Sequence, residues 1–227
     1  MSRDAPLIVA IDGPAGVGKS TVARLLARRL GVPYLDTGAM YRALALEALE
    51  RGLDPSDRLA IEALAETVAL AVGPPGEGGD LPVLLDGEPV GERIRTPEVA
   101  AATSTIAAHA GVRRRLAALQ RDAALRCGGV VEGRDIGTRV VPEAPFKFYL
   151  EARPEVRFRR RWEELRERGR EVPYEEVAAD MSRRDHRDAH RSDSPLSRDS
   201  SHVGVDTSDR SAEEVVEGML AVIRGQR

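Results

Sequence analysis

Short apolar runs alternate along the chain with longer stretches in which apolar residues recur at helical spacing. The first run, residues 7–11, is continuous and predicts a strand buried on both faces. A helix is predicted next over 19–30, and Gly31 ends it. Further strands are predicted at 32–36, 130–132, 146–150 and 202–206, and helices at 39–50, 58–71, 97–110, 112–126, 154–168, 174–190 and from Ser211, where a capping box begins. Strands that alternate with helices indicate a parallel, doubly wound sheet.

One stretch interrupts this alternation. Residues 73–80 are rich in glycine and proline and predict a loop. Beyond them, two short apolar runs flank Asp86 and Gly87, a dipeptide preferred in two-residue hairpin turns. We therefore expect residues 73–105 to form a small β-containing insertion in a core made of 1–72 and 106–227.

Composition narrows the class of protein. The chain has 227 residues, of which 42% are hydrophobic and 31% charged, which suits one globular domain. Its net charge of −3 argues against a partner that is a polymeric nucleic acid. Cys127 is the single cysteine, which fits a reducing compartment. No apolar run is long enough for a signal segment or a membrane span, so we expect a cytoplasmic protein with no membrane partner.

Residues 13–20 match the phosphate-binding pattern G-x-x-x-x-G-K-[ST] between a predicted strand and a predicted helix. Glycines let backbone N–H groups surround an anion, and the start of the helix adds its own unpaired N–H groups. Lys19 is placed to reach the β- and γ-phosphates of ATP, and the Ser20 hydroxyl to ligate Mg²⁺. The residues predicted to bind ATP are Gly13, Pro14, Ala15, Gly16, Val17, Gly18, Lys19, Ser20 and Thr21.

This P-loop does not by itself name a reaction, because switches, motors and kinases share it. A guanine-reading Asn-Lys-x-Asp segment needs a lysine other than Lys19, and the only other one, Lys147, stands between two phenylalanines. A motor ATPase would carry a strand that ends in paired acids, and the chain has none. The pattern therefore favours a small-molecule kinase.

Arginines recur where a second phosphorylated molecule would have to be neutralised by charge-assisted hydrogen bonds. Arg42 follows the second predicted strand, and Arg134 follows the strand at 130–132, at the carboxyl edge where such sheets bind ligands. One predicted helix carries Arg157, Arg160 and Arg161 on one face. Another carries Arg184 and Arg191 on one face, together with Asp188. Arginines often only solvate a helix face, but several that converge on one edge indicate a binding site.

Five segments resemble bacterial cytidylate kinases, in the same order and over nearly the whole chain: 11–21, 35–42, 94–99, 132–138 and 183–188. The resemblance implies a three-layer α/β/α P-loop kinase fold with a parallel sheet. It also implies that 73–105 is the insert that binds the nucleoside monophosphate, and that 157–173 is a short Arg-rich lid. Glu132 stands where many members have aspartate, which keeps the charge but leaves its role open.

The same resemblance implies the roles of single residues. Thr37, Arg42, Arg134 and Arg191 match positions that hold the CMP phosphate, and Ser104, Arg113 and Asp135 match those that read cytosine. Arg184 and Asp188 match the ribose-binding positions, and Arg157 and Arg160 match lid arginines that close over ATP. Lys19, Arg134, Arg157 and Arg160 would be the catalytic residues, with Glu132 added to the CMP site.

The expected activity is transfer of the γ-phosphoryl group of MgATP to CMP, and to dCMP, by a monomer. An arginine that donates to N3 and O2 of cytosine and a carboxylate that accepts from N4 would reject uracil, whose O4 is an acceptor. Two alternatives stay open: a kinase of the shikimate type or one that prefers uridylate, and a nucleotide-dependent switch without turnover.

Overall fold

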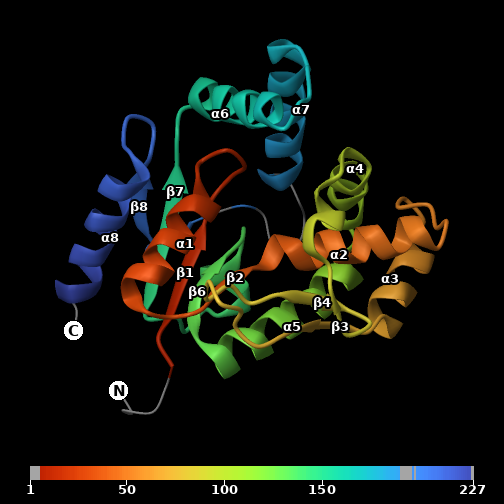
Figure 1. The fold of residues 1–227 in the computed structure, drawn as a ribbon, viewed down its shortest axis with the longest axis horizontal. Helices are drawn as coiled ribbons and strands as arrows, with labels where there is room; N and C mark the ends of the chain where they lie inside the picture. Colours follow the sequence, from red (N-terminus) through yellow and green to blue (C-terminus); the bar gives the residue numbers. More distant parts are fainter. Residues whose placement is uncertain (1–5, 190–195, 197, 226–227) are drawn as a thin grey trace.

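The computed structural model describes residues 6–189, 196 and 198–225. Its centre is a five-stranded sheet in the order β2-β6-β1-β7-β8, with every neighbouring pair parallel (Figure 1). These strands are β1 (Ile8–Asp12), β2 (Tyr34–Asp36), β6 (Gly129–Glu132), β7 (Phe146–Glu151) and β8 (Val203–Asp206). The helices are α1 (Lys19–Leu30), α2 (Thr37–Glu50), α3 (Arg58–Thr67), α4 (Pro97–Ile106), α5 (Ala110–Cys127), α6 (Pro154–Glu167), α7 (Tyr174–Ala189) and α8 (Ala212–Gly225), with short helical turns η1 (Gly91–Arg95) and η2 (Ile136–Val140). The predicted parallel sheet is confirmed.

Helices cover both faces of this sheet because successive side chains of each strand point to opposite sides. On β1, Val9 and Ile11 share an apolar cluster with α1 and α8. Ile8 and Ala10 share another cluster with α5 and η2. The result is the three-layer α/β/α arrangement that the resemblance implies, and it leaves the carboxyl ends of the strands open for ligands.

A second, antiparallel sheet lies beside α2 to α5 and is made of β3 (Leu70–Val72), β4 (Val83–Leu85) and β5 (Glu88–Pro89). The predicted hairpin is confirmed, and both turn residues have positive φ, 51° at Asp86 and 85° at Gly87. The prediction that the helix starting at residue 58 extends to residue 71 was wrong. It stops at Thr67, because Val68 is extended and the next residues pair with β4. The antiparallel sheet thus starts before residue 73.

The boundary between α4 and α5 also differs from the prediction. The chain leaves the first helix after Ile106 and enters the second at Ala110, so Gly111 lies inside α5 instead of separating two helices. Its N–H belongs to the first turn, where no intrahelical acceptor exists, and it donates to the Glu62 carboxylate at 2.8 Å. A Cβ atom here would lie 2.5 Å from the carboxyl carbon of Glu62, so a larger residue would require the Glu62 side chain to move.

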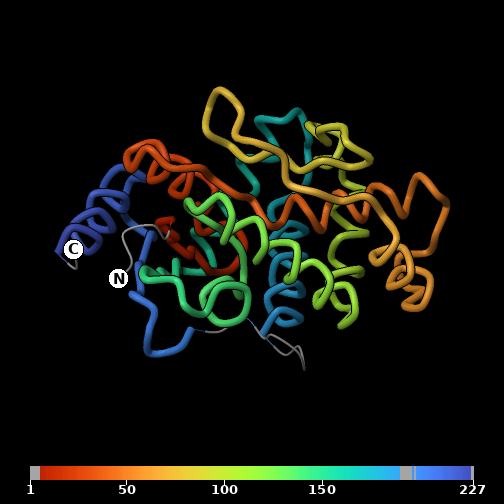
Figure 2. Tube along the Cα trace, turned by 90° about the horizontal axis from the view of Figure 1, so that it is seen from below, coloured from red at the N-terminus to blue at the C-terminus, as the bar shows by residue number. Residues whose placement is uncertain are grey.

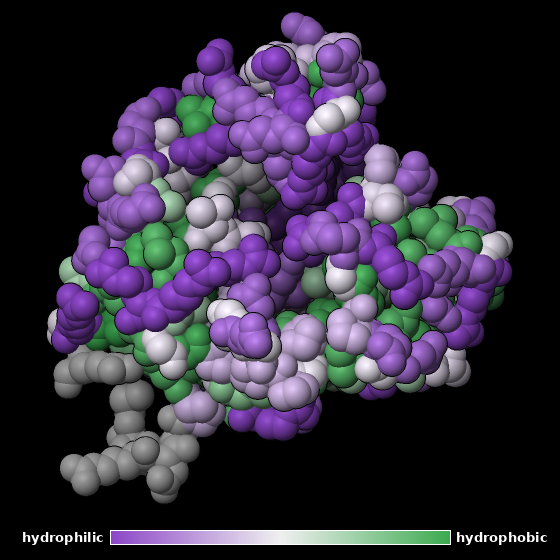
Figure 3. All heavy atoms as spheres, in the orientation of Figure 1, coloured by the Kyte–Doolittle hydropathy of each residue, from purple (hydrophilic) through white to green (hydrophobic). Residues whose placement is uncertain are grey.

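The remaining predicted helices lie close to their predicted positions, and the capping box is present, with Ser211 and Glu214 exchanging hydrogen bonds. The hairpin formed by α6 and α7 stands above the carboxyl edge of the sheet (Figures 1 and 2). The molecular surface is hollowed beneath it and bordered by hydrophilic side chains (Figure 3). In the part of the chain that the structure describes, no helix is both long and apolar enough to cross a membrane.

Candidate functional site

The P-loop connects β1 to α1, and its conformation depends on glycine. Gly13, Gly16 and Gly18 have φ angles of 147°, 77° and 84°, a region that other residues rarely adopt. At Gly13 a Cβ atom would lie 2.2 Å from the carbonyl oxygen of Leu150 on β7. The loop is therefore pressed against the sheet, and the unpaired N–H groups of the first turn of α1 lie beside it.

Lys19 is held inside this loop. Its Nζ donates to the Pro14 carbonyl oxygen at 2.7 Å, and the residue is buried. Burial, together with the charge of Arg134, lowers the pKa of Lys19 well below its ordinary value. A polyphosphate in the loop would supply the opposite charge and favour the ammonium form again.

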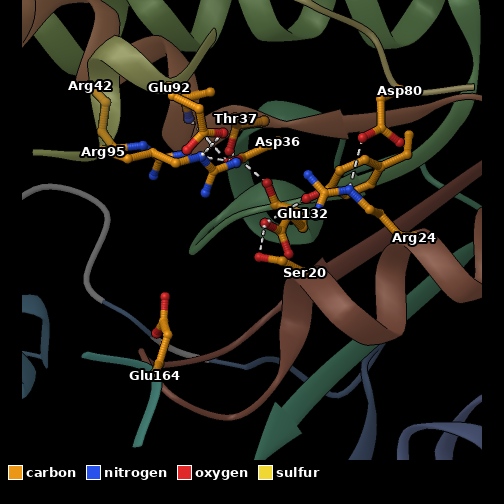
Figure 4. A network of polar contacts seen from close by, with 12 residues as sticks. Ser20, Arg24, Asp36, Thr37, Arg42, Asp80, Glu92, Arg95, Glu132 and Glu164 are labelled. Carbon is orange, nitrogen blue, oxygen red and sulfur yellow. Dashed lines mark hydrogen bonds and ion pairs between the residues drawn. The ribbon is translucent and has the colours of Figure 1, made fainter. Parts of the chain in front are cut away.

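Glu132, at the end of β6, connects the loop to the sheet (Figure 4). Its Oε1 accepts from the hydroxyl groups of Ser20, at 2.7 Å, and Tyr34, at 2.9 Å. Its Oε2 is buried and has no hydrogen bond among the described residues. Burial is the main cause that raises the pKa of Glu132, and nearby Asp36 adds to it. The Thr37 hydroxyl donates to the backbone oxygen of Glu132 at 2.7 Å, so this predicted CMP-site residue is buried and engaged.

The side-chain oxygen atoms of Ser20 and Glu132 are suited to binding a hard cation. Ser20 is exposed, its hydroxyl lies next to a carboxylate, and that carboxylate has an unused buried oxygen. Within residues 6–189, 196 and 198–225, no three His, Cys, Asp or Glu side chains form a group that could hold a metal ion. The donor set fits Mg²⁺ of the kind that protein oxygens share with nucleotide phosphates.

Arg134 joins three elements at the carboxyl edge. Its Nη1 donates to the Gly13 carbonyl oxygen at 2.9 Å, and its Nε pairs with Asp188 on α7 at 3.1 Å. Arg184 lies one helical turn before Asp188. Burial lowers the pKa of Arg184 to about 10, and the charge of Arg134 acts in the same direction. We call Arg134, Arg184 and Asp188 the acceptor cluster, and it lies directly beside the P-loop.

Arg42 lies on α2, where it pairs with Asp36 at 2.6 Å (Figure 4). Its charge, like that of Arg161 on α6, lowers the pKa of Arg184. Helices α2, α6 and α7 and the segment after β6 therefore place four arginines close together, namely Arg42, Arg161, Arg184 and Arg134. An anion of two or more charges would relieve their mutual repulsion.

The two predicted lid arginines lie in different places. Arg157 is buried, donates to the Ala15 carbonyl oxygen at 3.1 Å and pairs with Asp185 at 2.6 Å. Arg160 instead donates to the hydroxyl and carbonyl oxygens of Thr207, at 3.0 and 2.6 Å. Arg157 thus connects the α6–α7 hairpin to the P-loop, whereas Arg160 connects it to the turn after β8.

The residues predicted to read cytosine come from three segments. Ser104 is half-buried on α4. Arg113 is buried on α5, and its Nη1 donates to the carbonyl oxygens of Ala107 and Ala108, both at 2.8 Å. Asp135 directly precedes η2. Arg191, predicted to bind the CMP phosphate, lies outside the described residues.

Sequence reasoning did not select several side chains that organise this site. Asp12 accepts the N–H groups of Ile136 and Gly137, both at 2.8 Å, and Tyr34 and Asp185 hold Glu132 and Arg157. The usable signal for Asp12 was its position, an acidic residue directly after an apolar strand and before Gly13. Asp185 carried no comparable signal, because it is one of many charges on its helix.

Comparison with known proteins agrees with this geometry. A family model described as "Cytidylate kinase" matches residues 9–225. "Cytidylate kinase" of Solibacter usitatus is 45% identical over 97% of this chain and 93% of its own, and that of Rhodococcus opacus is 47% identical over 96% and 94%. A solved structure of an uncharacterized protein from Eubacterium ventriosum has a TM-score of 0.51 at 15% identity, covers 96% of this chain and 98% of its own, and supports the fold alone. The match extends across the P-loop, the acceptor cluster and both sheets, and so this chain belongs to the cytidylate kinase family and is a kinase.

Proposed function

We propose that this enzyme transfers the γ-phosphoryl group of MgATP to CMP, and also to dCMP, to give the diphosphate and ADP. The observation that carries the proposal is the single hydrogen bond from Arg134 to the Gly13 carbonyl oxygen, which joins the P-loop to the acceptor cluster. A donor phosphate in the loop and an acceptor phosphate at the cluster would be neighbours. The relatives named cytidylate kinase support the choice of acceptor.

Phosphoryl transfer to an acceptor that is already ionised needs no strong base, so positioning and charge stabilisation supply the catalysis. In this proposal Lys19 binds the β- and γ-phosphates, and Arg134, Arg157 and Arg160 balance charge that develops between the nucleotides. Ser20, supported by Glu132, holds Mg²⁺, which when bound neutralises the phosphate oxygens. The α6–α7 hairpin excludes water from the transfer.

We further propose that CMP binds with its phosphate at Thr37, Arg42, Arg134 and Arg191, and its ribose at Arg184 and Asp188. Ser104, Arg113 and Asp135 would read the base. Arg113 supplies donors for N3 or O2, and Asp135 supplies an acceptor for the N4 amino group, which uracil lacks. In this proposal residues 73–105 form the insert over the monophosphate, and residues 157–173 form the lid over ATP.

A panel of acceptors tests the proposal. ADP release with MgATP is measured with CMP, dCMP, UMP, AMP and shikimate, and with the K19A variant as the matched inactive control. We expect turnover with CMP and dCMP at a kcat/KM at least about 10²-fold above that for UMP, because a carboxylate that faces O4 is a repelling contact. Equal turnover of UMP would overturn the reading of the base, and ATP binding without ADP release for any acceptor would indicate a switch.

A further inference from the structure

His202 is a buried histidine that phosphoryl transfer does not use. It directly precedes β8, and its side chain has no exposed surface. Its ring lies edge-on to Tyr149 of β7, with centroids 6.4 Å apart. On the other side it contacts Gly137, where a Cβ atom would lie only 2.6 Å from the ring Nε2. Packing therefore fixes the orientation of the imidazole.

In this orientation both ring nitrogens face carboxylates. Nε2 lies 3.5 Å from the Oδ2 of Asp12, and Nδ1 lies 3.0 Å from the Oδ1 of Asp199. A neutral imidazole has one N–H, so one of these carboxylates would face a lone pair. Nδ1 is also 3.4 Å from the N–H of Asp199, but accepting that bond would leave it against the Asp199 carboxylate. Nε2 makes no hydrogen bond among the described residues, so its contact with Asp12 is an ion-pair contact, which only the imidazolium makes favourable.

The other ionisable groups around the ring do not cancel this preference. The Ser201 hydroxyl and N–H hold the pKa of Asp199 at about 2, so Asp199 stays ionised. On β7, burial raises the pKa of Tyr149, which keeps that phenol neutral. The Nζ of Lys147, also on β7, donates to the Ser201 hydroxyl at 3.1 Å and makes no hydrogen bond with the imidazole. The nearby Asp12 carboxylate is the main cause that raises the pKa of His202.

Asp12 makes this histidine relevant to the reaction. It is fully buried and directly precedes Gly13 of the P-loop. Each of its carboxylate oxygens accepts one N–H from the start of η2, at 2.8 Å, and η2 directly follows Arg134 and Asp135. Asp12 is thus a second connection, beside Arg134, between the loop for the donor phosphates and the segment proposed to bind the acceptor.

We propose that His202 is a positioning residue whose imidazolium holds the Asp12 carboxylate and thereby keeps residues 134–137 in place relative to the P-loop. The role rests on the proposed function, since it serves transfer from ATP to CMP. A histidine with a raised folded-state pKa is charged below that pKa and loses its charge as the pH rises through it. The KM for CMP should therefore rise with pH through the pKa of His202.

Two measurements test this on the whole enzyme. Imidazole NMR titration, assigned with the H202Q variant, gives the pKa of His202, which we expect to lie above its ordinary value of 6.5. Steady-state kinetics between about pH 6 and about pH 9 should show the KM for CMP rising by about three- to tenfold through that same pKa, with a smaller change in kcat.

Three variants distinguish positioning from a general structural effect. H202Q keeps an amide donor near Asp12 but has no titratable ring, so its KM for CMP should lose the step at the pKa of His202 and keep the change that ionisation of the CMP phosphate produces near about pH 6. D199N removes a half-exposed carboxylate and should move the step in KM to lower pH together with the NMR pKa. H109Q is the matched control, because the His109 ring bonds the Pro55 carbonyl oxygen and neither Asp12 nor Asp199, and it should leave the step unchanged.

A His202 pKa at or below 6.5, or a step in KM that persists in H202Q at the pKa measured for His202 in the wild type, overturns the positioning role. If H202Q does not fold, the D199N shift alone decides, and an unmoved step overturns the role. The NMR titration needs no substrate, so its result is separate from the proposed function. Absence of turnover with CMP overturns the proposed function and the positioning role together, whereas a normal pKa with intact turnover overturns the positioning role alone.

Discussion

Replacing Tyr34 by phenylalanine removes one hydroxyl group from the contacts that hold Glu132. Tyr34 is 2% exposed, and its Oη donates to the Glu132 carboxylate at 2.9 Å. The guanidinium group of Arg24, which pairs with Asp80, stacks over the Tyr34 ring at 4.9 Å. Phenylalanine keeps the ring and this stacking, so the substitution isolates the hydrogen bond.

The structure sets the size of the effect. A hydrogen bond to a charged partner contributes about 1.5–3 kcal/mol to the free energy of unfolding. No compensation is available nearby, since the second oxygen of Glu132 accepts no hydrogen bond among the described residues. We expect a loss within that range, and a loss of about 2 kcal/mol would lower the Tm of a chain this long by about 4–8 °C.

Urea unfolding of the wild type, Y34F, E132Q and the double variant measures this loss in the free energy of unfolding. The two substitutions should be coupled, with the double variant less destabilised than the sum of the single ones. A Y34F protein within about 0.5 kcal/mol of the wild type would refute the reasoning, as would strict additivity, because either result would mean that the hydroxyl does not stabilise the carboxylate.

Three further predictions concern the P-loop and the acceptor cluster. The K19M variant should lose at least about 10²-fold in kcat/KM, because a charge aimed at the transferred phosphate is removed, while calorimetry still detects CMP binding. G13A should lose more than about 3 kcal/mol of unfolding free energy in urea, since its Cβ would lie 2.2 Å from the Leu150 carbonyl oxygen, and a stable G13A protein would contradict this packing. D188N leaves Arg134 without its charged partner on α7 and should raise the KM for CMP about tenfold with little change in the KM for ATP; an equal rise for both substrates would argue against the separation of donor and acceptor sites.

Local patterns explain what the sequence could predict of the fold. Strand β1 is an almost continuous apolar run because it lies inside a sheet that is covered on both faces. The hairpin follows from Asp86 and Gly87, whose backbone angles few other pairs adopt. Gly111 was misread because a glycine that admits the Glu62 carboxylate looks the same in sequence as one that ends a helix. The end of α3 was missed because the partner strand that draws residues 70–72 into a sheet comes later in the chain.

In the candidate site, too, some residues could be predicted from local sequence patterns and others could not. The P-loop is contiguous, so its spacing alone predicts it. Arg134 and Asp188 meet across a sequence separation of 54 residues, and only helical spacing and the family resemblance placed them in one site. The link from His202 to Asp12 depends on how β1, β7 and β8 lie side by side, which no local pattern reveals.

The crowding of arginines beside the P-loop has a consequence for the protein before any nucleotide binds. Burial, and after it the charges of Arg134, Arg161 and Arg42, lowers the pKa of Arg184 to about 10, so holding these cations in the cleft costs folding free energy. An anion that carries two or more charges reduces the repulsion between these arginines when it binds. The Tm of the protein should therefore be higher in sulfate or pyrophosphate than in chloride at equal ionic strength. The enzyme thus has a lower free energy of unfolding than it would have without this cluster of cations. In exchange, the cluster attracts phosphorylated molecules.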